Sequence, residues 1–511
     1  MSLNSTGPIS LGGSTSGQSI ELELGETGTQ PISMGDSIVR GFLGVPSGAI
    51  SLDIAHGKSL FAGTLQTTIT QPSNAYANTY AGFGYSNAIS DDGLTMIIGG
   101  PNDYAFGYGG TGHPTTLGAA WIFTRANTNT TTWTQQAKLL GSGGVGAMTA
   151  SQYTTGFSVS VGWSVAISND GNTVAIGSPP RVENPPSGGV DYGVGGVWVY
   201  TRSGTTWSQQ AGPLTYTSNN CGTNSWGIGW SLAISGDGNT IAAGQPNYGT
   251  NSGGNANQGG VVVFVRSGTT WSAQSGLLQG SDTTRALGTF MGWSVSLSKD
   301  GNTLAFGGFG DGYNSTTGVA VGATWIFTRS GSTWSQQGTK KIGTGGVPGS
   351  GQGSVVALSG DGTVLATSDP TDNSNVGAIW IFTRSGSTWT QQGSKLVGTG
   401  GSTASGSVGQ GSALALNYAG TLLAVGAYQD SGSGTTANGA MWMFKSNADA
   451  GTFTQLGSKI VGNNQQGVFL GEGISIANTA GTVVVSGAGA GAPYGDAGYS
   501  TIANQQVLVY N

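Results

Sequence analysis

The side chains that could carry out chemistry are few in this chain, and their spacing assembles no catalytic set. With His56 and His113 as the only histidines, neither a metal triad nor a Ser-His-Asp set can be built. Residues 59–511 contain only Glu183 and Glu472 as glutamates, whereas hydrolysis by a carboxylate pair needs two acids at a defined separation. We therefore predict that the chain is not an enzyme and that it binds neither a metal nor a cofactor.

We predict that the aspartates, the cysteine and most of the arginines have structural rather than catalytic roles. The only plausible acids are the aspartates expected on variable loops, although solvation at the surface is the commoner explanation for such residues; they are Asp311, Asp430 and Asp496. The single Cys221 cannot form an internal disulfide. Five arginines share one position of a repeat and are predicted to bond a local turn or a neighbouring blade; they are Arg125, Arg202, Arg266, Arg329 and Arg384.

Those arginines belong to a phrase that recurs seven times: an apolar strand, a tight turn and a second apolar strand. The turn glycines of successive copies are 78, 67, 63, 61, 58 and 61 residues apart; they are Gly93, Gly171, Gly238, Gly301, Gly362, Gly420 and Gly481. A period of this length filled with strand patterns is typical of a radial array. We predict an all-β fold, a seven-bladed β-propeller of four-stranded antiparallel blades.

The repeat also resembles a known family. The phrase SGDGNT…GAAWIFTRSGSTWTQQGSKLVGTG is similar to the bacterial form of the FG-GAP repeat over roughly residues 60–511, and this resemblance implies propeller blades. In the calcium-binding FG-GAP repeats of integrins, an Asp-rich loop holds the metal. The turns of this chain offer at most two carboxylates, fewer than the roughly six oxygen ligands that a hard cation takes. We therefore expect the fold without the calcium.

The last repeat lacks its fourth strand. Residues 507–510 match a third strand, and residues 60–70 form a strand pattern that belongs to no blade. We predict that these two segments pair and close the ring, because closure removes two exposed strand edges. The propeller is accordingly assigned to residues 59–511, and a separate N-terminal module to residues 1–58.

Recognition is expected on one face of the disc. In an up-and-down blade, the short turns lie on one face, whereas the long second-to-third loops and the connections between blades lie on the other. Aromatic residues on loops held by a rigid scaffold suit the binding of sugar or protein. The candidates are Tyr104, Tyr108, His113, Tyr192, Trp226, Tyr248, Tyr313, Tyr428 and Tyr494. The alternative is that these rings only pin the glycine-rich loops to the blades.

Residues 1–58 do not share the repeat. The string ISLGGSTSGQSIELELG…ISMGDSIVRGFLGVPSGAISL resembles the N-terminal segment of tailed-phage virion proteins, especially tail and fibre components. The resemblance implies an attachment module that other virion proteins bury. Its apolar residues would make the contact; they are Ile9, Leu11, Ile20, Leu22, Leu24, Val39, Phe42 and Leu43. The alternative is a strand pair that packs on the propeller.

The composition of the chain argues against several classes of binding partner. The net charge of −6 gives no electrostatic reason to bind nucleic acid or an anionic membrane, and no apolar stretch is long enough for a transmembrane helix. The N-terminus shows no basic and apolar secretory pattern.

Together these features predict a structural virion protein of a tailed bacteriophage, made in the host cytoplasm and oligomeric in the particle. It would be a tail, fibre or baseplate appendage that displays a propeller to a host-surface glycan or protein. The alternatives are a capsid or neck decoration protein without receptor binding, and a propeller glycosidase or lyase.

Overall fold

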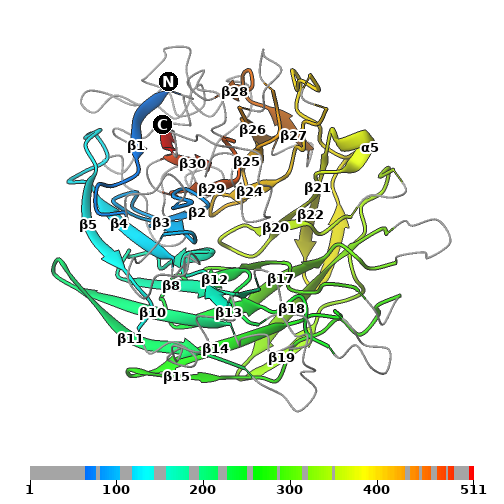
Figure 1. Ribbon diagram of the computed structural model, residues 1–511. Helices are drawn as coiled ribbons and strands as arrows, with labels where there is room; N and C mark the ends of the chain where they lie inside the picture. The colour runs from blue at the N-terminus through cyan, green and yellow to red at the C-terminus, as the bar shows by residue number, and fades with distance from the viewer. Residues whose placement is uncertain are drawn as a thin grey trace, which may run out of the picture.

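Seven four-stranded antiparallel sheets stand around a common axis and form a β-propeller (Figure 1). The computed structural model describes residues 64–75, 81–103, 118–142, 157–182, 195–216, 227–249, 257–284, 288–312, 320–347, 351–404, 406–431, 438–447, 452–461, 469–478, 481–487 and 506–510. The fold class predicted from the repeat is confirmed.

The first three blades follow one another along the chain. Blade 1 contains β2 (Ser86–Ile89), β3 (Thr95–Gly100), β4 (Ala119–Thr124) and β5 (Thr134–Leu139). Blade 2 contains β7 (Ser164–Ile167), β8 (Thr173–Ser178), β10 (Gly196–Ser203) and β11 (Thr206–Leu214). Blade 3 contains β12 (Leu232–Ile234), β13 (Thr240–Gly244), β14 (Val261–Ser267) and β15 (Thr270–Ala273). A small two-stranded sheet pairs β6 (Phe157–Val159) with β9 (Pro180–Val182).

Blades 4 to 7 continue the same order. Blade 4 contains β16 (Ser294–Leu297), β17 (Thr303–Gly308), β18 (Ala323–Ser330) and β19 (Thr333–Gln336). Blade 5 contains β20 (Val355–Leu358), β21 (Val364–Asp369), β22 (Ala378–Ser385) and β23 (Thr388–Gln391), with the single turn α5 (Asp372–Asn375) after β21. Blade 6 contains β24 (Ala413–Leu416), β25 (Leu422–Ala427), β26 (Ala440–Asn447) and β27 (Thr452–Gln455), and β28 (Ile460–Val461) also pairs with β26. Blade 7 contains β29 (Gly473–Ile476), β30 (Val483–Gly487), β31 (Gln506–Tyr510) and β1 (Leu65–Thr70).

A serine and an aspartate build the turn between the first two strands of a blade. In blade 2, the Ser168 hydroxyl donates to Asp170 Oδ1 (2.5 Å) and accepts the Thr173 N–H (3.0 Å). Gly171 takes the left-handed conformation (φ +66°) that the turn needs and that glycine adopts without steric cost. The same serine–aspartate bond recurs at Ser235, Ser298 and Ser359. These turns fix the hairpin register, which places alternate side chains of every blade on the same sides.

The core lies between neighbouring blades. The first strands contact one another in a closed circle around the axis, and the second strands are buried along their length. A tryptophan on the third strand of five blades is 2% exposed or less and belongs to this core; these residues are Trp121, Trp198, Trp325, Trp380 and Trp442.

The repeated arginines also connect blades, as predicted. Arg329 of blade 4 donates to Asn302 of its own turn (3.1 Å) and to Thr240 of blade 3 (3.3 Å). It lies 5.4 Å from the ring centre of Trp334, and both side chains donate to Gln274 of blade 3, at 3.2 and 3.0 Å. Equivalent Arg-Trp-Gln contacts join blade 1 to blade 2 and blade 2 to blade 3.

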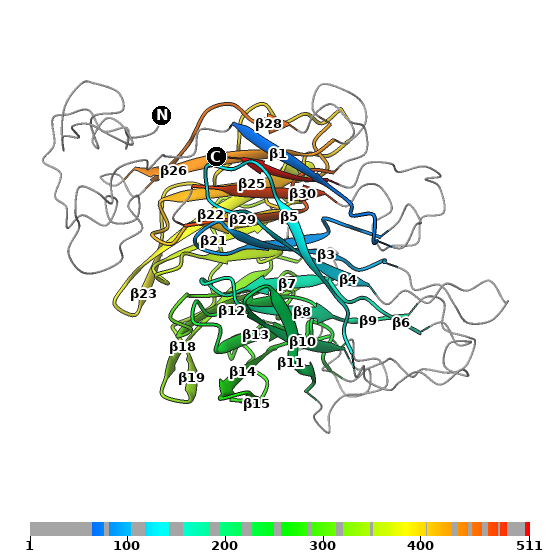
Figure 2. The ribbon, with the colours of Figure 1, turned by 90° about the vertical axis from the view of Figure 1, so that its left-hand side faces the viewer.

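The strand that precedes blade 1 closes the ring, which confirms the predicted pairing. β1 runs antiparallel to β31 with Ile69 opposite Val507 and Leu65 opposite Tyr510, and the two strands lie side by side in Figures 1 and 2. Gln66 accepts from Arg125 of blade 1 (3.2 Å), as the equivalent glutamines of other blades do. β1 therefore serves as the fourth strand of blade 7.

The two faces of the disc differ in their connections. The turns between first and second strands and between third and fourth strands lie on one face, which we call the turn face; all other connections lie on the loop face. Leu65 lies opposite Tyr510, which pairs with Val483 next to a short turn, so β1 begins at the turn face. Residues 1–58, with their eight predicted contact residues, lie outside the described residues. Nowhere in the described ranges is there a helix long and apolar enough to span a membrane.

Candidate functional site: an aromatic arc at the axis

Aromatic side chains gather at the start of the first strands, on the loop face. The residue that precedes this strand segment is Tyr85 in blade 1, Trp163 in blade 2, Trp230 in blade 3 and Trp293 in blade 4. Successive ring centres in this row are 4.9, 4.9 and 4.6 Å apart. Because the first strands form the innermost circle, these four rings make a continuous arc beside the axis. We call this row the aromatic arc.

A glycine with positive φ places each ring of the arc. Gly162, directly before Trp163, has φ +90°, and a Cβ on this residue would lie 2.2 Å from the Ala119 carbonyl oxygen. The neighbouring blade backbone therefore leaves room for glycine alone. The sequence phrase Gly-aromatic-Ser marks each of the four positions, and this signal was not singled out in the sequence analysis.

Two phenylalanines extend the arc at blade 4. The ring of Phe290 stacks on that of Phe309, with centres 4.9 Å apart and planes 4° apart. The ring of Trp293 stands at 75° to that of Phe309, at 4.8 Å. All three side chains are half-buried, so part of each ring remains accessible to solvent. The three rings form a corner of two perpendicular aromatic planes.

Phe290 is held in an unfavourable backbone conformation. Its φ is +57°, and the left-handed region costs a residue with a Cβ about 1–2 kcal/mol. The equivalent position, three residues before the arc position, is Gly82 (φ +67°) in blade 1 and Gly409 (φ +70°) in blade 6. Blade 7 carries a second exception, Phe469, with φ +49°.

The rest of the axial rim is polar. The positions equivalent to the aromatic arc are Ser354 in blade 5, Ser412 in blade 6 and Glu472 in blade 7. Glu472 is thus the only ionisable carboxyl group among the seven positions. An apolar surface with a few polar groups beside it is the usual composition of a small-molecule or sugar site.

Two of the nine loop residues predicted to bind are within the described part of the chain. Tyr428 follows β25, is half-buried, and its ring centre is 6.3 Å from that of Phe469. Tyr248 follows β13 and is half-buried; its backbone carbonyl accepts the Gly259 N–H (3.0 Å). The other seven lie outside the described residues: Tyr104, Tyr108, His113, Tyr192, Trp226, Tyr313 and Tyr494. Their role stays a prediction.

Two of the three aspartates considered as acids on variable loops, Asp311 and Asp430, occupy buried positions at the loop bases, and Asp496 lies outside the described residues. Asp311 and Asp430 are 1% and 0% exposed, and they form ion pairs with Lys340 and Lys459. Asp103 and Asp372 hold the same position in blades 1 and 5 and pair with Lys138 and Lys395. Solvation does not explain these carboxylates, because each is enclosed with a lysine. Those of Asp311, Asp372 and Asp430 also accept a backbone N–H from a connection between blades.

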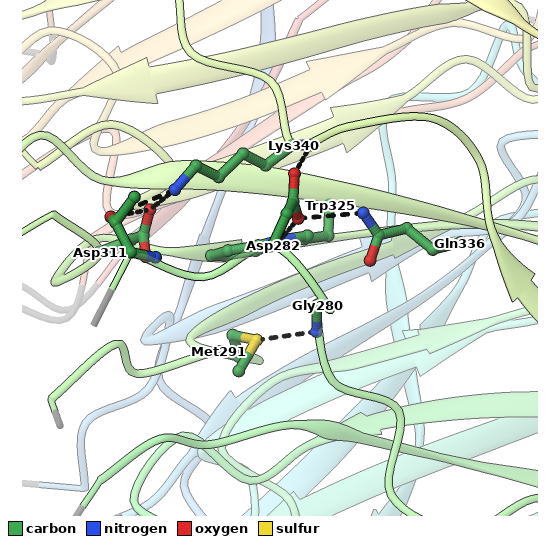
Figure 3. A network of polar contacts seen from close by, with 8 residues as sticks. Gly280, Asp282, Met291, Asp311, Trp325, Gln336 and Lys340 are labelled. Carbon is green, nitrogen blue, oxygen red and sulfur yellow. Dashed lines mark hydrogen bonds and ion pairs between the residues drawn. The ribbon is translucent and has the colours of Figure 1, made fainter. Parts of the chain in front are cut away.

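Figure 3 shows this network in blade 4. Asp311 Oδ1 accepts the Thr284 N–H (3.0 Å) while Lys340 reaches its other oxygen. Asp282 accepts the Trp325 indole N–H (2.9 Å) and the Lys340 backbone N–H (2.7 Å). Burial acts to raise the pKa of Asp282, but these hydrogen bonds outweigh it and hold the pKa below its usual value. In the described part of the chain, no three His, Cys, Asp or Glu residues lie close enough to hold a metal ion.

Comparison with known proteins shows the architecture alone. No protein-family model matches the chain, and no curated protein matches it. A chain from Bacteroides uniformis, provisionally named a 6-phosphogluconolactonase, is 14% identical, with a TM-score of 0.45 over 74% of this chain and 85% of that one. A periplasmic gluconolactonase of Pseudomonas aeruginosa is 15% identical, with a TM-score of 0.43 over 73% and 84%. The hydrazine synthase of Kuenenia stuttgartiensis is 10% identical, with a TM-score of 0.43 over 82% and 96%.

The names of these structures correct one prediction. We expected from the small catalytic inventory that the chain is not an enzyme, yet two similar propellers bear the names of lactonases. Our expectation rested on the lack of a carboxylate pair and of a histidine-based set, and enzyme sites can be built from other groups. At such low identity the likeness brings no substrate and no reaction to this chain.

Proposed function

We propose that this chain is a structural protein of a tailed-phage particle whose propeller presents its loop face to a molecule of the host surface. The observation that carries the proposal is the aromatic arc, extended by Phe290 and Phe309 on the same face. Trp163 and Trp230 of the arc are buried, whereas Tyr85, Trp293, Phe290 and Phe309 are half-buried. These half-buried rings on a rigid closed propeller form a preorganised surface, which lowers the entropy that binding costs.

The direction of the chain supports an anchor on the opposite side. β1 enters the propeller at the turn face, away from the aromatic arc. An appendage needs this arrangement, with attachment on one side and recognition on the other. The attachment role of residues 1–58 is supported by their resemblance to tailed-phage virion proteins and by an apolar content too small for an independent core.

A truncation tests the proposal. A chain that begins at Ser59 keeps β1 and all seven blades, so we expect it to remain soluble and to melt cooperatively. In purified particles, mass spectrometry should find the full chain at stoichiometric amounts and the truncated chain at background level. Normal incorporation of the truncated chain would assign the docking surface to the propeller, and absence of the full chain from particles would refute the virion role.

A further inference from the structure

We infer that the loop face binds a neutral polysaccharide by stacking pyranose rings on two aromatic stations. Station 1 comprises Phe290, Trp293 and Phe309, and station 2 comprises Tyr428 and Phe469. The inference deepens the proposed recognition role and depends on it only for the source of the polysaccharide. It needs no contribution from residues 1–58.

The backbone at station 1 is fixed without the Phe290 ring. The Phe290 N–H donates to the Asn257 carbonyl (2.9 Å), and the Trp293 N–H donates to the Phe290 carbonyl (3.1 Å). The next residue, Met291, donates its N–H to the Gln258 carbonyl (3.0 Å). A glycine would form the same bonds and would adopt φ +57° without strain. The turn therefore does not require an aromatic residue, and the ring needs another explanation.

The same reasoning applies at station 2. Phe469 also has positive φ, and the following Leu470 donates its N–H to the Asn438 carbonyl (3.1 Å). Its ring approaches Tyr428, which occupies in blade 6 the position that Phe309 has in blade 4. Strained backbone that persists in a well-fixed structure clusters at ligand sites. Two strained aromatic residues on one face, both at a position that a glycine with positive φ fills in blades 1 and 6, point to a ligand with more than one ring.

The charges beside the stations select a neutral ligand. Asp311 follows Phe309 by two residues and is paired with Lys340; Asp430 follows Tyr428 by two residues and is paired with Lys459. In the described part of the loop face, each station thus adjoins an ion pair whose two charges compensate each other. A cage for a quaternary ammonium would be favoured by a nearby carboxylate. The rim position of station 1 is Trp293, which carries no charge, whereas Glu472 follows Phe469 of station 2 by three residues, so tetramethylammonium is included among the probes.

A nucleic-acid strand also stacks its rings on aromatic side chains, but it requires a positively charged groove along its backbone. The net charge of −6 and the pairing of both lysines argue against it. A pyranose presents a flat face of C–H groups, whose positive edges are attracted to the negative face of an aromatic ring. Its hydroxyl groups suit the serine hydroxyls and the Glu472 carboxyl group of the polar rim.

Binding to the full-length protein tests the inference. Cellohexaose, maltohexaose and chitohexaose serve as probes, because they differ in linkage and substituent but share the apolar pyranose face. Calorimetry measures affinity, and intrinsic fluorescence reports on the tryptophans of the aromatic arc. We expect at least one hexasaccharide to bind saturably. Phe290→Gly and Phe469→Gly should each weaken it by about tenfold, the loss expected for one aromatic stacking contact. Phe290→Tyr should retain binding, and Tyr418→Ala, on the turn face, is the matched control.

Stability separates a binding role from a packing role. If the Phe290 ring serves the ligand, Phe290→Gly relieves strain and should leave the melting temperature unchanged or raise it. A lower melting temperature with unaltered binding would assign the ring to packing and overturn the inference. Saturable binding of tetramethylammonium without hexasaccharide binding would overturn the inference in favour of a cation site. The inference would also be overturned if none of the three hexasaccharides bound at concentrations up to about 20 mM, well above a millimolar dissociation constant. Incorporation into particles is measured separately, so loss of sugar binding and loss of the virion role remain distinguishable.

Discussion

The bond between Gln274 of blade 3 and Trp334 of blade 4 offers a direct measurement of how the blades are held together. Gln274 Oε1 accepts the indole N–H at 3.0 Å, and Trp334 is only 8% exposed. In Gln274→Leu the indole loses its acceptor while still buried, which costs about 1–3 kcal/mol. Arg329, which also donates to Gln274, keeps bonds to Asn302 and Thr240, so its loss adds little.

Other blades provide a control for the stability loss expected of Gln274→Leu. Blade 6 has Phe453 where blades 1 to 5 have the tryptophan, and Gln392 of blade 5 donates to Thr383 of its own sheet instead (2.7 Å). In blade 1 the Trp133 indole N–H has no hydrogen-bond partner, and Gln66 accepts from Arg125. Gln66→Leu is therefore the matched control, and it should cost less than Gln274→Leu.

A double-mutant cycle with Trp334→Phe isolates the bond. Without the indole N–H, the Gln274→Leu change should be nearly neutral, which gives a coupling of about 1–2 kcal/mol. A ring of this size shifts its melting temperature by only about 1 °C per kcal/mol, because unfolding entropy is about 2 cal/mol/K per residue. Hydrogen exchange at β15 and β19 is more sensitive, since the same loss raises local opening by about 5–30-fold. If Gln274→Leu lowered the stability equally with Trp334 and with Phe at position 334, the hydrogen bond between Gln274 and Trp334 would not contribute to holding the blades together.

Three further predictions follow from the buried polar groups and the closing strand. Lys459→Met should destabilise the protein by about 3–5 kcal/mol, because it leaves Asp430 buried and unpaired. Lys299→Met, at a more exposed ion pair, should cost less than about 1 kcal/mol. Chemical denaturation measures both changes in the free energy of unfolding. Ile69→Ala should cost about 2–5 kcal/mol and promote proteolysis of β1, and Thr70→Ala, at an exposed site, should behave as wild type. Burial acts to raise the pKa of the turn aspartates, but hydrogen bonds from serine and asparagine, together with an arginine charge, hold this pKa below the ordinary 3.8. The melting temperature should therefore be highest above pH 4 and should fall as the pH drops below 4. An Asp→Asn triple variant should flatten this acid dependence; the residues are Asp170, Asp237 and Asp300.

The fold could be predicted because its determinants are local and repeated. A serine–aspartate–glycine turn, alternating apolar strands and a fixed period each specify one blade, and seven copies specify a closed ring. The pairing of β1 with β31 was also predictable, because blade 7 lacked a fourth strand and residues 65–70 lacked a blade. These inferences require only the pattern along the chain.

The aromatic arc could not be predicted in the same way. Trp163 was assigned to a strand with alternating faces, and nothing in a single copy indicates that its ring touches Trp230 and Tyr85 from other blades. The burial of Asp311 was missed for a similar reason, since its partner Lys340 is 29 residues away and follows the fourth strand. Contacts between blades depend on geometry around the axis, which sequence spacing does not express.

A repeat protein nevertheless carries its own internal reference. A residue that serves the blade should recur at its position, as the second-strand apolar residues and the turn serines do. A residue that departs from the repeat and also costs conformational free energy needs a reason outside the blade. Phe290 and Phe469 meet both conditions, because each holds an aromatic ring at positive φ where Gly82 and Gly409 satisfy the same turn. The search for function in this propeller should therefore begin with the positions where the blades differ, and the loop face at blades 4 and 7 is where the described residues place them.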